Sequence, residues 1–81
     1  NMMGNKDLAR EYFNKSIVYA KASNNKSYLA FIYKNLGVLE KKSGNYDESI
    51  LNYNLALQHY ESISDDFNIS EILQNLGNVY L

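Results

Sequence analysis

The fold is decided by residues 35–57, NLGVLEKKSGNYDESILNYNLAL, because parts of this stretch recur forty residues away. Asn35-Leu36-Gly37 returns as Asn75-Leu76-Gly77, and Gly44-Asn45 is preceded at the same interval by Gly4-Asn5. A fixed period of this size indicates an array of small supersecondary units. Stacked units form extended surfaces, so the period favours binding over catalysis as the function.

The composition limits the class of protein. The chain has 81 residues, a formal net charge of −1, one histidine and no cysteine. A chain of this length forms one small domain at most, and its near-neutral charge provides no basic patch for nucleic acid or an acidic membrane. No apolar run approaches the ~20 residues of a membrane span, and no signal peptide is visible. We therefore expect no nucleic acid and no membrane as partners, and a cytoplasmic location.

Four helices are expected, near residues 5–22, 27–43, 46–62 and 67–81. Proline is absent, glycine occurs only four times, and apolar residues recur three and four positions apart, which is the helical pattern. Gly44 is expected to end the second helix, because glycine accepts left-handed backbone dihedrals. Amphipathic helices joined by loops this short pack as antiparallel neighbours.

Polar residues mark the expected helix starts. We expect Asn5 to cap the first helix, and Asn45 to form a capping box with Glu48 at the start of the third. Asp65-Asp66 is interpreted as a loop followed by the start of the fourth helix. The remaining prediction concerns the core, where four tyrosines fall at the spacing of packed residues: Tyr33, Tyr46, Tyr53 and Tyr60.

The order of these residues resembles the tetratricopeptide repeat (TPR). In that family, helix A carries a leucine and then a small residue, the turn is glycine-x-tyrosine, and helix B has a small residue, an aromatic and then alanine-leucine. Leu36-Gly37 fits helix A and Gly44-Asn45-Tyr46 fits the turn. The remaining matches agree in register across helix B and the flanking motifs: Ser49, Tyr53 and Ala56-Leu57; Ala9, Phe13 and Ser16-Ile17 after Gly4; and Leu76-Gly77 with Tyr80.

The chain departs from the usual TPR pattern at three points. Glu40 stands where helix A usually has an aromatic, no proline closes helix B, and the period is forty rather than about 34. The longer period resembles the extended-helix subclass, which includes kinesin light chain and many bacterial sensor and regulator proteins. The resemblance implies an all-α fold, an α-α superhelix (TPR-like solenoid) of four antiparallel helices that forms a partial array.

In the phase of that family, the chain starts and stops inside motifs, so we expect a piece of a longer array. Residues 69–80 then carry an apolar face that no helix covers. Such a fragment is expected to be weakly stable, or to form a homo-oligomer through its exposed terminal helices.

The resemblance also implies a concave groove lined by the two A helices. The residues expected to point into it are Phe31, Lys34, Asn35, Val38 and Lys42 on one helix, and Glu71, Gln74, Asn75 and Asn78 on the next. An amide carries both donors and an acceptor, so Asn35 and Asn75 could pair with the main chain of an extended peptide, as asparagines do in the longer-period relatives. The alternative interpretation is that both amides cap or brace neighbouring helices.

Two further hypotheses concern charged residues. Lys34 and Lys42 resemble part of the carboxylate clamp of chaperone-binding relatives, but Glu71 and Gln74 stand where further basic groups would be needed. The alternative is a solvated lysine face. His59 has no second histidine or cysteine for a metal and no nucleophile at helical spacing, so we expect no catalytic residue, no metal site and no cofactor.

The leading functional hypothesis is a protein–protein interaction module. It would hold a peptide or helix of a protein partner in the concave groove, as part of a larger scaffold, sensor or regulator. The alternative is a purely structural spacer or self-association segment with no peptide ligand. An enzyme is not expected, because no nucleophile, base and oxyanion site occur together.

Overall fold

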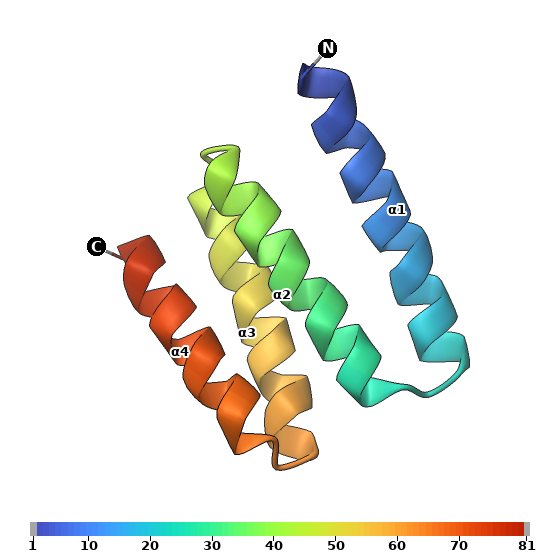
Figure 1. Cartoon of the computed structure of the whole chain (residues 1–81), viewed down its shortest axis with the longest axis vertical. Helices are drawn as coiled ribbons and strands as arrows, with labels where there is room; N and C mark the ends of the chain where they lie inside the picture. Colours follow the sequence, from blue (N-terminus) through green and yellow to red (C-terminus); the bar gives the residue numbers. More distant parts are fainter. Residues whose placement is uncertain (1, 81) are drawn as a thin grey trace.

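The computed structural model describes residues 2–80 and the side chains of residues 5–80. This part of the chain is all α-helical: α1 (Met2–Ala22), α2 (Lys26–Lys42), α3 (Tyr46–Ser62) and α4 (Asp66–Tyr80) run as successive antiparallel neighbours (Figure 1). The all-α fold of four antiparallel helices in a repeat-like arrangement is thus confirmed. Residue 81, which was predicted to end the fourth helix, lies outside the described residues.

The first helix begins earlier than the sequence predicts. It begins at Met2, so Gly4 and Asn5 lie inside the helix, and the prediction that Asn5 caps it is wrong. The physical reason is that a glycine costs a helix only about 1 kcal/mol relative to alanine, so it does not end a helix by itself. The starts and ends of α2 and α3, and the start of α4, fall within one residue of their predicted positions.

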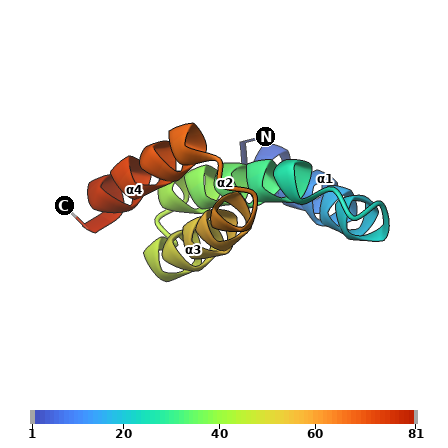
Figure 2. The same ribbon diagram turned by 90° about the horizontal axis from the view of Figure 1, so that it is seen from below.

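The helices form a thin, curved layer around a central pair. The Cα extents are 39 × 34 × 16 Å, and α2 and α3 form the most extensive packed pair, with α1 against α2 and α4 against α3. Figure 2 shows α3 on one side of α2, while α4 and α1 flank the pair. Each outer helix therefore contacts fewer neighbours than the inner two.

The core lies where the central pair meets its flanking helices. Tyr33, Tyr53 and Tyr60 are buried as predicted, whereas Tyr46 is exposed and its predicted core position is wrong. Tyr46 is the first residue of α3, where the helix has just left the turn and lies beyond the packed faces. The full set of buried apolar residues is Ala20, Leu29, Ala30, Ile32, Tyr33, Leu36, Tyr53, Ala56, Tyr60, Ile72 and Leu76.

The three turns between helices have one shared conformation. Asn24, Gly44 and Ser64, spaced twenty residues apart, have positive φ angles of 53°, 81° and 55°. In each turn this residue donates its N–H to the carbonyl three positions earlier, and the next residue donates to the carbonyl five positions earlier. This pair of bonds is the Schellman motif. Gly44 therefore ends α2 as predicted, and the same turn recurs where the sequence has Asn or Ser.

The residue after each left-handed position directly precedes the next helix. Its side chain caps that helix in two of the three turns. The side-chain oxygens of Asn25 and Asp65 accept the N–H groups of Tyr28 and Asn68, which caps α2 and α4 and confirms the predicted helix start at Asp65-Asp66. Asn45 occupies the N-cap position of α3 without capping it. The predicted capping box is therefore wrong.

The Asn45 amide is used instead in a polar network that joins α1 to the α2–α3 turn. Its Nδ2 donates to Glu40 Oε1 at 3.2 Å, and the Arg10 guanidinium donates to the same carboxylate, with Nη2 to Oε1 at 2.7 Å. Arg10 also contacts Asp7 and the Ser43 hydroxyl. This network accounts for the charged residue at position 40: it is the buried acceptor for the only arginine of the chain.

The closest approach of two helices is at Gly37. A Cβ atom at this position would lie 2.6 Å from the Cδ1 and Cε1 atoms of Tyr53, and the Ser49 hydroxyl donates to the Gly37 carbonyl at 2.7 Å. A side chain at position 37 would therefore force the tyrosine ring or the helices to shift, which favours glycine at this contact.

Candidate functional site

The nine residues predicted to line a groove lie on α2 and α4, and this surface is called the α2–α4 face below. An ion pair joins its two helices: Lys34 Nζ lies 3.1 Å from Glu71 Oε1. The same ammonium lies 4.8 Å from the centre of the Phe31 ring. The structure thus brings Phe31, Lys34 and Glu71 together, in a geometry that favours a cation over an aromatic face.

This ion pair changes what the α2–α4 face can bind. The Lys34 side chain is only 19% exposed, and its charge is met by Glu71. Lys34 is therefore neither part of a solvated lysine face nor free to hold a carboxylate. Lys42, in the last turn of α2, is exposed as a solvated lysine would be.

The two asparagines occupy equivalent places on α2 and α4. Asn35 and Asn75 are both half-buried. Within residues 5–80, no hydrogen bond joins either side-chain amide to another residue, whereas the amides of Asn45, Asn52 and Asn68 are all bonded. The described contacts thus give no support to a bracing role for these two amides, and their donors and acceptors remain available.

The other predicted residues divide into two groups. Val38 is half-buried and packs against the hydrophobic core. Gln74 and Asn78 are exposed on α4. Phe31 keeps 47% of its surface exposed despite the lysine beside it, so it offers an aromatic surface next to the asparagines.

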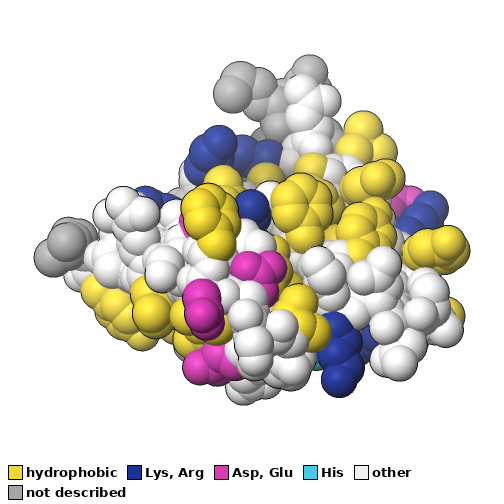
Figure 3. Space-filling view, turned by 60° about the horizontal axis from the view of Figure 1, so that its bottom comes forward, with side chains coloured by type: hydrophobic (Ala, Val, Ile, Leu, Met, Phe, Trp, Pro, Cys, Tyr) yellow, Lys and Arg dark blue, Asp and Glu magenta, His cyan; other side chains and the backbone are white. Residues whose placement is uncertain are grey.

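Exposed apolar side chains are frequent over the described surface. Figure 3 shows several groups of hydrophobic side chains on one face, with acidic groups between some of them and basic groups towards the edges. Single exposed hydrophobic residues are normal, but a contiguous set indicates contact with another molecule. The large exposed residues include Leu8, Tyr12, Val18, Tyr19, Phe31, Phe67, Leu73 and Tyr80.

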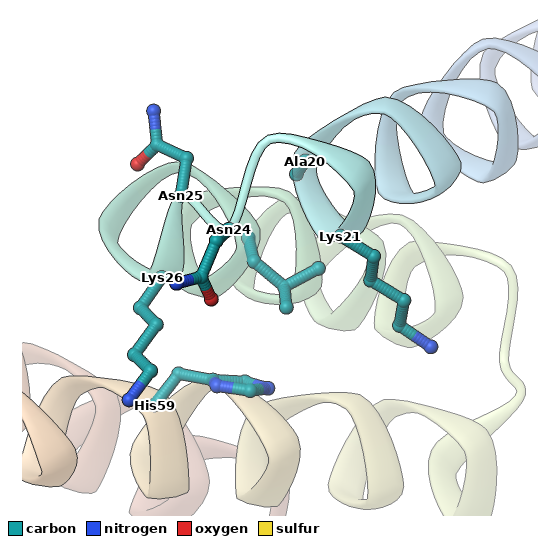
Figure 4. Close-up of a pocket in the computed structure, with 7 residues that line it drawn as sticks. Ala20, Lys21, Asn24, Asn25, Lys26 and His59 are labelled. Atoms are coloured by element: carbon teal, nitrogen blue, oxygen red, sulfur yellow. The ribbon is translucent and has the colours of Figure 1, made fainter.

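A separate hollow lies between the α1–α2 turn and α3, and the sequence did not predict it. Its volume is about 220 Å³. Figure 4 shows Lys26 extending from the start of α2 towards His59 on α3, with Lys21 on another side and Asn25 pointing away. The His59 ring stacks on Tyr33, with centroids 5.8 Å apart and planes at 5°. The residues belong to three helices, so no local motif could have signalled this hollow.

The electrostatics of this hollow disfavour a charged imidazole. Burial lowers the pKa of His59 below its ordinary value, and the nearby positive charges of Lys26 and Lys21 lower it further. Both effects favour the neutral form of the imidazole. Across residues 5–80, no group of three His, Cys, Asp or Glu side chains could hold a metal ion. The walls of the hollow are apolar at Ala20 and Leu29, and the other lining residues are lysines, asparagines and His59.

Comparison with known proteins adds no identification. No family model matches this sequence, and neither the curated proteins nor the solved structures include a significant match. None of the helices in residues 2–80 combines the length and apolar character that crossing a membrane requires. The geometry of the site therefore has to carry any functional conclusion.

Proposed function

We propose that this chain is a protein-binding module that holds an extended segment of a partner peptide on the α2–α4 face, as part of a larger TPR-like scaffold or regulator. The observation that carries the proposal is the pair of unbonded amides, Asn35 and Asn75, at equivalent positions of two helices. Neither amide is shielded from solvent, so a peptide main chain could replace water at its donors and its acceptor. The resemblance to the longer-period TPR subclass supports the same assignment.

The surroundings of the amides indicate the kind of peptide. Lys34 is neutralised by Glu71, and Phe31 offers an apolar surface beside them. A segment that presents its main chain to the amides and an apolar side chain to Phe31 fits this face better than an acidic terminus. Recognition of this type reads the extended backbone first and the side chains second.

The test is a selection of unstructured peptides from a random display library against the chain, followed by affinity measurement by fluorescence anisotropy. Replacing both Asn35 and Asn75 by alanine should weaken the selected peptides about tenfold or more, because each lost hydrogen bond contributes about 0.5–1.5 kcal/mol. Asn14 and Asn54 form a matched control, since they are also a pair forty residues apart and both are exposed on α1 and α3. Their double alanine variant should bind within about twofold of the unchanged chain, well below the cost of one lost bond.

The same variants test the alternative that the two amides brace the helices. A bracing role predicts that the Asn35→Ala, Asn75→Ala chain melts earlier than the control, with peptide affinity lost only as far as folding is lost. An unchanged melting temperature with unchanged peptide affinity would remove the amides from the proposal.

A further inference from the structure

The hollow between the α1–α2 turn and α3 has an apolar wall that the proposed peptide site does not use. Its residues come from three consecutive helices and the first turn, and none of them lies on the α2–α4 face. Ala20 is fully buried and Leu29 is 6% exposed, so packing holds both side chains in place. The His59 ring is positioned by its stack on Tyr33. This wall is therefore formed before any ligand binds.

Two lysines give the same hollow a positive charge that no carboxylate neutralises. Within residues 5–80, neither Lys21 nor Lys26 forms an ion pair, whereas Lys34 is paired with Glu71. Both ammonium groups lower the pKa of His59, and no carboxylate is among the causes of that shift. Figure 4 shows Lys26 extending towards His59, with Lys21 on another side of the hollow. A concave surface lined by charges of one sign concentrates ions of the opposite sign, so this hollow is complementary to an anion.

The repeat shows that the fold does not need lysines at these two positions. A shift of forty residues, from the α1–α2 turn to the α3–α4 turn, places Glu61 at the position of Lys21 and Asp66 at the position of Lys26. Both turns have a left-handed residue at the same place and the same pair of backbone hydrogen bonds. The turn forms with charges of either sign, so its geometry does not account for the lysines.

The size of the hollow limits what it can hold. Its volume is about 220 Å³, and an apolar protein cavity of about 150 Å³ is known to bind benzene. A ring-sized body with one charged group therefore fits the volume. Ligand sites commonly combine apolar walls with a few polar groups that fix the orientation of the ligand, and this hollow has both.

We propose that this hollow is a binding site for a small aromatic carboxylate. The ring of the ligand packs against Ala20 and Leu29 beside the His59 imidazole. The carboxylate accepts hydrogen bonds from the ammonium groups of Lys21 and Lys26, which are charge-assisted bonds. Binding of the anion offsets the positive charges that act on His59, so it raises the pKa of the imidazole. The site does not depend on the proposed peptide binding, since the two share no residue.

The first experiment titrates benzoate into the chain at constant ionic strength and follows the ring protons of His59, the only histidine, by NMR. We expect saturable shifts with a Kd between about 0.1 and 10 mM, the range for a ligand of this size, and a raised pKa of His59 at saturation. Benzamide has the ring without the charge, and acetate has the charge without the ring, so each should bind at least about tenfold more weakly. Shifts that do not saturate by about 50 mM benzoate, equal affinity for benzamide, or an unchanged pKa of His59 would each overturn the proposal.

The second experiment replaces the two lysines by the residues of the equivalent turn. Lys21→Glu with Lys26→Asp should fold, because the α3–α4 turn forms with these residues, and should bind benzoate at least about tenfold more weakly. Lys21→Gln with Lys26→Gln removes the charges without reversing them and should also weaken binding. Circular dichroism and the melting temperature check that both variants are folded.

The matched control for the charge reversal is Lys15→Glu with Lys42→Asp. It makes the same change in net charge at two exposed lysines outside the hollow, and it should bind benzoate within about twofold of the unchanged chain. An equal loss in the control would assign the effect to net charge, and retained binding in the folded variants of Lys21 and Lys26 would remove the lysines from the site. Either result would overturn the proposal.

Discussion

The α2–α3 pair and the two outer helices carry one sequence pattern in two different states. In the inner pair, Tyr53 covers Gly37 and is 2% exposed. On the outside, Phe13 and Gly77 hold the equivalent positions, but they lie on α1 and α4 and do not meet. The difference teaches that the glycine and the aromatic residue form a close contact only when they lie on two helices that pack together. Phe13 and Gly77 each supply one side of such a contact, but their helices do not pack on each other.

The largest expected difference between the two regions comes from the aromatic rings. Tyr53→Ala should destabilise the chain by about 3–5 kcal/mol, as for other large aromatic residues removed from a core. Phe13→Ala should cost about half as much or less, because Phe13 is only half-buried. Urea unfolding followed by circular dichroism measures both.

A graded variant keeps this test informative if Tyr53→Ala does not fold. Tyr53→Leu retains much of the buried volume and should give a measurable loss between those of the unchanged chain and the alanine variant. Equal losses of stability for Phe13→Ala and Tyr53→Ala would contradict the difference between the buried Tyr53 and the half-buried Phe13.

The second prediction is that replacing glycine by alanine changes the stability in opposite directions at Gly37 and at Gly77. Gly37→Ala should destabilise the chain by up to about 2 kcal/mol, because the overpacking cost of about 1–3 kcal/mol is offset by a gain of about 1 kcal/mol in helix propensity. Gly77→Ala should stabilise it by up to about 1 kcal/mol, since the propensity gain is unopposed in open space. Thermal unfolding of both variants and of the unchanged chain at one protein concentration gives both values. A loss of stability in Gly77→Ala would contradict the open space at Gly77, and a gain in Gly37→Ala would contradict the close contact with Tyr53.

The same comparison shows how far the sequence could predict the molecule. The period and the helical spacing predicted the number of helices and their antiparallel order. The position of Gly44 predicted where the second helix ends. Loops were expected around Asn24 and Ser64, but their left-handed backbone dihedrals were not predicted, although these residues lie twenty positions on either side of Gly44. Their residues carry only a weak preference for left-handed dihedrals, and the surrounding Schellman hydrogen bonds impose them.

Side-chain partners were less predictable than helices. Asn45 has the sequence signature of a cap, yet its amide binds Glu40 because the turn places the two side chains together. Arg10 and Glu40 are thirty residues apart, and Lys34 and Glu71 thirty-seven. No local pattern links such residues, since only the packing of helices determines which charges meet. The sequence therefore predicted which positions form the candidate site. It did not predict the ion pair between Lys34 and Glu71, or that the amides of Asn35 and Asn75 are without hydrogen bonds to other residues.

The third prediction concerns the charged contact between α1 and α2. Arg10 and Glu40 join α1 to α2, and a shift of forty residues replaces them with Ile50 and Tyr80. The hydrogen bond from Arg10, opposed by burial and assisted by Asn45, lowers the pKa of Glu40 below its ordinary value. A lowered pKa means that the folded chain favours the carboxylate, so this contribution to stability is present above the unfolded pKa and is lost as the pH falls through the folded value.

Urea unfolding between about pH 7 and pH 3, which spans the ordinary carboxyl pKa, measures this contribution. The unchanged chain should lose about 1 kcal/mol more stability over this range than Glu40→Gln. The expected difference is small because the Arg10–Glu40 ion pair is partly exposed, and such a pair contributes less than a fully buried one. Glu48→Gln is the matched control, because Glu48 is exposed on α3. If Glu40→Gln and the unchanged chain lose stability in parallel, Arg10 does not stabilise the ionised Glu40.

The smallest expected effect is at the His59–Tyr33 stack, whose outer equivalents are Tyr19 and Leu73. Burial, and then Lys26 and Lys21, lower the pKa of His59. The folded chain therefore favours the neutral imidazole, and stability falls slightly as the pH drops from the ordinary histidine value of 6.5 through the folded pKa. Because His59 is the only histidine, proton NMR follows its titration without ambiguity. Lys26→Gln should raise the pKa of His59 only in part, since burial is the larger cause. Lys15→Gln is the control, because it changes an exposed lysine of α1 away from the hollow and should leave the pKa of His59 unchanged.

A return of the His59 pKa to its ordinary value in Lys26→Gln would instead assign the whole shift to charge. It would mean that the stack on Tyr33 does not bury the imidazole as the packing of α2 on α3 requires.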